Sequence, residues 1–113
     1  MSNEWIGVDL DGTLAKYNGP GKCNIGRPIK LMVRRVKEWL GQGKSVRIFT
    51  ARVSSTVPLH RRLDQVTSIG RWCKKHIGVE LPVTAEKDNT MVELWDDRAV
   101  RVELNTGVIK SVL

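Results

Sequence analysis

The sequence predicts an α/β fold with a mainly parallel sheet. Short apolar segments of strand length alternate with two longer segments in which apolar residues recur at helical spacing. Strands joined by helices in this way form right-handed crossovers, and the resulting sheet has helices on both faces, a three-layer, Rossmann-like arrangement. A chain of 113 residues is long enough for one core, so we expect a single domain over residues 1–113.

Four apolar segments are predicted to be strands: residues 5–9, 46–49, 81–84 and 91–95. Three of them end in polar side chains that could carry chemistry: Asp9 and Asp11, Thr50 and Arg52, and Asp96 and Asp97. Ligands of parallel α/β sheets bind at the carboxyl ends of the strands. We therefore expect these side chains to converge on one place.

Two segments have the pattern of amphipathic helices. The first starts at Pro28, which suits a first helical turn, and ends before Gly41; its apolar positions are Ile29, Met32, Val33, Val36 and Leu40. The second runs from Pro58 to Ile77; its expected buried face is Leu59, Leu63, Val66, Ile69, Cys73 and Ile77. Residues 99–104 and 108–112, on either side of an Asn-Thr-Gly turn, predict a C-terminal β-hairpin.

The charge distribution favours a phosphorylated or polyanionic partner. The chain has 19 Lys and Arg against 12 Asp and Glu, a net charge of +7, and within residues 27–76 the only acids are Glu38 and Asp64. A field of this sign attracts phosphate groups, although a basic surface can also serve solubility alone. No apolar run has the length of a membrane span and no signal-peptide pattern is present, so we expect a cytoplasmic protein without membrane association.

Asp9 and Asp11 are the most informative residues. Side chains two positions apart on a strand share a face, so both carboxylates can point into one small volume, where they repel each other. A hard cation such as Mg²⁺, which binds carboxylate, water and phosphate oxygens, relieves this repulsion. Mg²⁺ is preferred to zinc because no His or Cys ligand accompanies the carboxylates. Two acids that merely begin a turn are the alternative, but they do not explain a second acidic strand end at Asp96 and Asp97.

The chain resembles the haloacid dehalogenase (HAD) superfamily of aspartate-nucleophile phosphatases and phosphotransferases, whose four motifs can be matched in order. The matching segments are Asp9-Leu10-Asp11-Gly12-Thr13, Ile48-Phe49-Thr50, Lys87 and Trp95-Asp96-Asp97. The resemblance covers nearly the whole domain and implies a HAD core. Residues 12–27 and 78–88, the usual insertion points, have no room for a folded cap, so we expect a small capless phosphatase. A homo-oligomer or a large substrate would then cover its open site.

The resemblance implies a role for each catalytic residue. Asp9 would be the nucleophile that forms an aspartyl-phosphate, and Asp11 would protonate the leaving oxygen and then deprotonate the attacking water. Thr50 would contact a phosphate oxygen, and Lys87 would neutralise charge shared by the nucleophile and the phosphate. The short interval between Lys87 and the second acidic pair is similar to that of deoxyribonucleotidases.

The resemblance also implies the ligand sets. Asp9, the backbone carbonyl of Asp11 and Asp97 would hold Mg²⁺, while Asp96 would orient a water or Lys87, or exchange roles with Asp97. The expected substrate-binding residues are Thr50, Ala51, Arg52, Lys87 and Arg98. The Thr50-Ala51-Arg52 and Asp97-Arg98 segments resemble those of polynucleotide 3′-phosphatase domains. Alternatively, Arg98 pairs with a local acid such as Asp96.

The function expected from these residues is a Mg²⁺-dependent phosphomonoesterase acting on a nucleotide or a nucleic-acid end. One alternative is a phosphatase for a sugar phosphate or another small metabolite. The alternative from another class is a non-catalytic protein that uses the same scaffold to bind nucleic acid or a protein partner. The two intact acidic pairs argue against a non-catalytic protein. Salt-dependent binding to nucleic acid without turnover would favour a non-catalytic protein.

Overall fold

The computed structural model describes residues 3–19 and 24–110. In chain order its elements are β1 (Trp5–Asp9), α1 (Lys30–Gly41), β2 (Ser45–Phe49), the 3₁₀ helix η1 (Ala51–Val53), α2 (Leu59–His76), β3 (Val83–Thr84) and β4 (Met91–Trp95). The four strands predicted for the sheet and the two predicted helices are present. Helix α1 begins after Pro28, because Pro28 forms a bridge with Ala15 and the Ile29 N–H donates to the Leu14 carbonyl.

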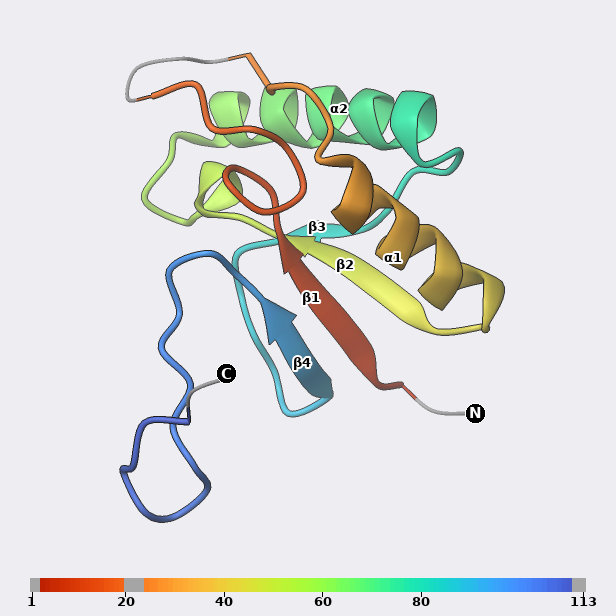
Figure 1. The fold of residues 1–113 in the computed structure, drawn as a ribbon. Coiled ribbons are helices and arrows are strands. Elements are labelled where there is room, and N and C mark those ends of the chain that lie inside the picture. Colours follow the sequence, from red (N-terminus) through yellow and green to blue (C-terminus); the bar gives the residue numbers. More distant parts are fainter. Residues whose placement is uncertain (1–2, 20–23, 111–113) are drawn as a thin grey trace.

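The strands form one four-stranded sheet in the order β3-β2-β1-β4, and every neighbouring pair is parallel. This arrangement confirms the predicted α/β class and parallel sheet. Asp9 lies opposite Phe49 of β2, and Val8 lies opposite Trp95 of β4. The arrowheads of β1, β2 and β4 in Figure 1 consequently point to the same edge of the sheet.

One face of the sheet forms the hydrophobic core with both helices. Ile6 and Val8 of β1 and Val46 and Ile48 of β2 belong to one buried cluster, which also contains residues from α1 and α2: Met32, Val33, Val36, Ile69, Trp72 and Cys73. Trp39 of α1 packs against Trp95 of β4 with ring centroids 5.0 Å apart, which extends the contact toward the far edge of the sheet. In the described residues, neither helix combines the length and apolarity needed to cross a membrane.

The other face carries no helix in the described part of the chain, although the sequence predicts helices on both faces. Strands β1, β2 and β3 follow one another in one direction across the sheet, so right-handed crossovers place both intervening helices on the same face. Residues 85–90, which return to β4, form a loop. On this face Trp5 is buried under Arg47, whose guanidinium lies 4.5 Å from the ring centroid, and the indole donates to Asp88 at 3.0 Å.

The predicted buried face of α2 is correct only for the C-terminal half of the helix. Ile69 and Cys73 are fully buried, whereas Leu59, Leu63 and Val66 are 60%, 58% and 42% exposed. The N-terminal half extends past the edge of the sheet, where β3 has only two residues and packs against α2 over a short length. Periodicity identifies a potential apolar face, but a neighbouring element must be present to bury it.

The predicted C-terminal hairpin is reduced to an isolated antiparallel bridge between Val102 and Ile109. Asn105 and Gly107 in the turn have positive φ values of 64° and 75°, as the turn prediction requires. Residues 99–110 are exposed and lie beside the sheet as a separate arm (Figure 1), so no third strand supports longer pairing. The last part of the predicted second strand lies outside the described residues.

Candidate functional site

Asp9, Asp96 and Asp97 come together at the carboxyl edge of the sheet. Asp9 is the last residue of β1, and the other two directly follow β4, the parallel neighbour of β1. One carboxylate oxygen from each of the three residues lies within 4.8 Å of the other two. The structure thus brings together the acidic ends of two segments that are separated by most of the chain.

The crowding of these carboxylates changes their proton affinity. Partial burial, the hydrogen bond with Asp97 and the charges of Asp96 and Asp97 raise the pKa of Asp9 to about 7. At Asp97, desolvation raises the pKa. Hydrogen bonds with Asp9 and Thr13 and the charge of Arg98 outweigh it, so the pKa of Asp97 is lowered. The two carboxyl groups therefore differ in proton affinity, and Asp9 binds a proton more readily than Asp97.

The donor chemistry of the cluster fits a hard divalent cation. All three side chains offer oxygen, which suits Mg²⁺, Mn²⁺ or Ca²⁺ better than a metal that prefers nitrogen or sulfur ligands. Partial burial is the largest cause of the raised pKa of Asp9, and the neighbouring negative charges of Asp96 and Asp97 add to it. The same excess charge that favours a proton would favour a cation.

The turn after β1 is shaped around Asp97. Gly12 has a φ of +91°, and a Cβ at this position would lie 2.8 Å from the Asp97 Oδ2 atom. The Thr13 hydroxyl lies 3.2 Å from Asp97 Oδ1 and 3.4 Å from Asp9 Oδ2, so it can donate to either carboxylate. Sequence reasoning included Thr13 in the first motif without assigning it a contact. Its position two residues after the second acid was the available signal.

Asp11 pairs with Arg52 instead of joining the acidic cluster. The guanidinium donates through Nε to Asp11 Oδ2 at 2.7 Å and through Nη2 to Oδ1 at 2.9 Å, a bidentate geometry. The Arg52 and Asp11 side chains are only 14% and 24% exposed, so solvent screens this pair less than a surface pair. Arg52 also donates through Nη1 to Gln65 of α2 at 3.1 Å. No sequence pattern pointed to Gln65.

Thr50 is buried at the junction of β2 and η1, with 4% of its surface exposed. Its backbone N–H donates to the Thr84 carbonyl at 2.9 Å, and its hydroxyl oxygen accepts the Arg52 backbone N–H at 3.2 Å. Because its backbone N–H is already used, Thr50 can donate a hydrogen bond to a phosphate oxygen only through its hydroxyl group. Ala51 is exposed and opens η1 next to it.

Lys87 and Arg98 are both exposed but differ in their relation to the acidic cluster. The Arg98 backbone N–H donates to Asp96 Oδ1 at 2.7 Å, and its positive charge contributes to the lowered pKa of Asp97. Lys87 lies in the loop between β3 and β4. Among the described residues, no hydrogen bond or ion pair connects Lys87 with the cluster. The structure therefore places Arg98 at the site and leaves the predicted role of Lys87 without a supporting contact.

Comparisons with known proteins give information on the fold alone. No family model and no curated protein matches the chain. Among solved structures, the chain is similar to a conserved protein from Bacteroides thetaiotaomicron, with 23% identity and a TM-score of 0.58. The match covers 85% of this chain and 77% of that protein. At this identity, the similarity supports a shared arrangement of strands and helices.

Proposed function

We propose that this protein is a HAD-type phosphomonoesterase that depends on Mg²⁺ and acts on a nucleotide or nucleic-acid phosphate in the cytoplasm. The convergence of Asp9, Asp96 and Asp97 carries this proposal. Three carboxylates within 4.8 Å repel one another, and such repulsion disfavours folding unless a cation or a proton offsets it. A cluster that is costly for stability is best explained by chemistry at that position.

Asp9 is the nucleophile in this proposal. One of its carboxylate oxygens attacks phosphorus and forms an O–P bond, while the bond from phosphorus to the ester oxygen breaks; that oxygen takes a proton from Asp11. Asp11 next removes a proton from water, whose oxygen attacks the aspartyl-phosphate, releasing inorganic phosphate and restoring Asp9. Bound at Asp9, Asp96 and Asp97, Mg²⁺ would neutralise the crowded carboxylates and the phosphate oxygens.

Arg52 has to change partners for this mechanism to operate. Asp11 can reach a leaving oxygen only after it leaves the bidentate pair with Arg52. A phosphate dianion offers a guanidinium the same fork geometry as a carboxylate and a larger charge. Entry of the substrate phosphate would therefore draw Arg52 away and release Asp11, which takes up a proton from solvent before donating it, while Gln65 keeps the guanidinium near the site.

The test is the release of inorganic phosphate from nucleotides, phosphorylated DNA ends and sugar phosphates, measured with Mg²⁺ and with EDTA. We expect release that requires Mg²⁺ and falls by at least about 10³-fold in Asp9→Asn. Asp64→Asn is the matched control, because it makes the same chemical change at an exposed position of α2. Absence of release from every substrate class, or full activity in Asp9→Asn, would overturn the proposal. Preference for sugar phosphates would overturn only the substrate assignment.

A further inference from the structure

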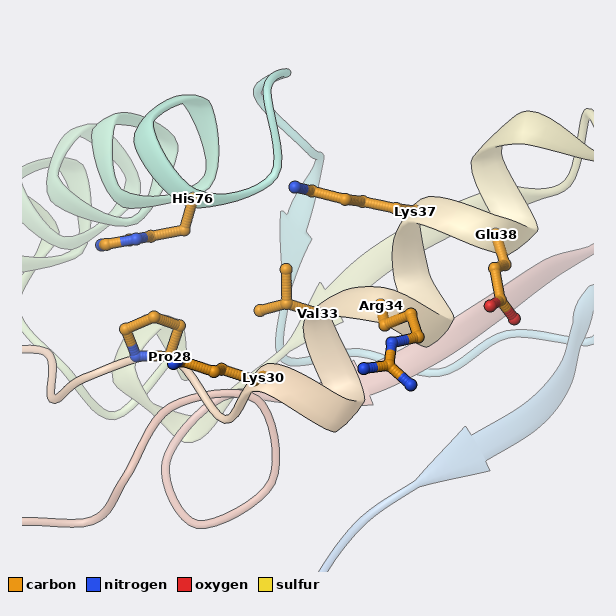
Figure 2. Close-up of a pocket in the computed structure, with 7 residues that line it drawn as sticks. All are labelled: Pro28, Lys30, Val33, Arg34, Lys37, Glu38 and His76. Carbon is orange, nitrogen blue, oxygen red and sulfur yellow. The ribbon is translucent and has the colours of Figure 1, made fainter.

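A second concave surface lies between α1 and the C-terminal end of α2. It encloses about 570 Å³ and combines four basic side chains with an apolar floor of Pro28 and Val33 (Figure 2). The basic residues are Lys30, Arg34 and Lys37 of α1 and His76 of α2. We call this surface the α1–α2 cleft. Its chemistry is the opposite of that of the acidic cluster.

The walls of the cleft are held together by buried contacts. The indole N–H of Trp72 on α2 donates to the Gly26 carbonyl at 3.0 Å, which ties α2 to the segment that leads into α1. The His76 ring packs against Trp72 with centroids 4.7 Å apart. Because these contacts do not depend on any ligand, the cleft is a preformed feature of the fold.

The positive charges of the cleft are available to an anion. Lys30, Arg34 and Lys37 occupy positions i, i+4 and i+7, so they follow one face of α1. Within residues 3–19 and 24–110, none of the three forms an ion pair, and Glu38 is the one acid among the lining residues. Figure 2 shows Lys37 extending toward α2, with Val33 between Lys37 and Lys30. An anion at this position would meet little competing negative charge.

The row of basic residues starts beside the loop that follows β1, the strand that ends in Asp9. The Lys16 N–H donates to the Arg27 carbonyl and the Ile29 N–H to the Leu14 carbonyl, both at 2.8 Å, so the start of α1 is tied to the loop that follows β1. A helical rise of ~1.5 Å per residue separates Lys30 from Lys37 by roughly 10 Å along the axis. Successive phosphates of a strand advance by about 3.4 Å in B-form DNA, so the row is longer than one phosphate group.

We propose that the α1–α2 cleft binds the phosphate backbone of a single nucleic-acid strand whose terminal phosphate enters the acidic site. Hydrolysis of that terminal phosphate rests on the proposed function, whereas binding of the strand does not. Affinity comes from the release of counterions when Lys30, Arg34 and Lys37 neutralise phosphates, with His76 at the opposite wall. The apolar floor accommodates sugar carbons between successive phosphates.

The test is the affinity of the full chain carrying Asp9→Asn for a short, fluorescently labelled single-stranded DNA with a terminal phosphate. Anisotropy is measured in EDTA from about 50 to about 200 mM KCl, a range over which phosphate contacts weaken strongly. Adding Lys30→Ala and Lys37→Ala should make the negative slope of log K against log[KCl] shallower by about 1.4, near 0.7 for each lost contact with a single strand. Alanine has a high helix propensity, so neither substitution should disrupt α1. Circular dichroism verifies that α1 and α2 are retained.

The matched control is Arg101→Ala with Lys110→Ala, which removes the same charge from the exposed C-terminal arm. We expect this pair to leave the slope unchanged. Equal effects of the two pairs of substitutions would show attraction by overall charge and would overturn strand binding by the cleft. Equal affinity for inorganic phosphate and for the strand would also overturn it. Strand binding through the cleft without phosphate release by the wild type would overturn only the proposed phosphatase activity. Phosphate release with no effect of Lys30→Ala and Lys37→Ala on the slope would overturn only strand binding by the cleft.

Discussion

Replacing Asp9 with Asn should stabilise the cation-free protein at alkaline pH, although Asp9 is the proposed nucleophile. Partial burial and the neighbouring carboxylates of Asp96 and Asp97 raise the pKa of Asp9 to about 7 in the folded protein, against about 3.9 for an unfolded chain. A group whose pKa is raised by folding contributes stability below its unfolded pKa, and this contribution is lost as the pH rises through the folded pKa. The wild type should therefore lose stability between about pH 4 and about pH 7.

The size of the effect follows from the shift. A pKa difference of about 3 units corresponds to at most about 4 kcal/mol. Asp9 is half-buried, and the lowered pKa of Asp97 acts in the opposite direction, so solvent screening and coupling reduce the expected value to about 1–2 kcal/mol. In a domain of this length, about 1 kcal/mol shifts the Tm by roughly 4 °C. Asp9→Asn should thus melt about 4–8 °C above the wild type at pH 8 and close to it at pH 4.

Thermal unfolding followed by circular dichroism in EDTA checks this prediction, with Asp64→Asn as the exposed control. Added Mg²⁺ should raise the Tm of the wild type at pH 8 but not at pH 4, because protons and the cation compete for the same carboxylates. Asp9→Asn should respond less. A Tm for Asp9→Asn at pH 8 that equals or falls below that of the wild type would refute the cost assigned to a charged, partly buried and crowded Asp9.

Two further substitutions test the packing around the site. Gly12→Ala should destabilise the protein by about 1–3 kcal/mol in urea unfolding, because its φ of +91° is strained for alanine and the new Cβ would meet Asp97; an unchanged midpoint would contradict this close approach. Trp72→Phe should cost about 1–3 kcal/mol, because it leaves the buried Gly26 carbonyl without its 3.0 Å hydrogen bond; a loss below about 0.5 kcal/mol would show that this bond does not hold α2 in place.

The strands, the helices and the acidic edge of the sheet could be predicted because their signals are local. Apolar periodicity marks each element, and parallel strands place their carboxyl ends together whatever their order. Asp9 and Asp97 were therefore predicted to converge from positions at opposite ends of the chain. The exposed half of α2 could not be predicted in the same way, because periodicity does not reveal whether β3 is long enough to cover Leu59 and Leu63.

The contacts between side chains remained beyond prediction from a single sequence. Arg52 was expected at the rim with the substrate, but the structure pairs it with Asp11 and supports it with Gln65. This choice depends on the position of η1 relative to the turn after β1 and on the rotation of α2, and neither leaves a periodic signal. The predicted role of Lys87 likewise depends on the path of a loop.

The sequence by itself determined the succession of strands and helices and the placement of acids at strand ends, because both depend on residues that are neighbours in the chain. Only the tertiary structure decided that β4 lies beside β1, which puts Asp97 against Asp9, and that both helices cover one face. It also separated the two acids of the first motif, leaving Asp9 in the cluster and Asp11 with Arg52. Such pairings are set by packing between distant segments, where many partners compete for the same space.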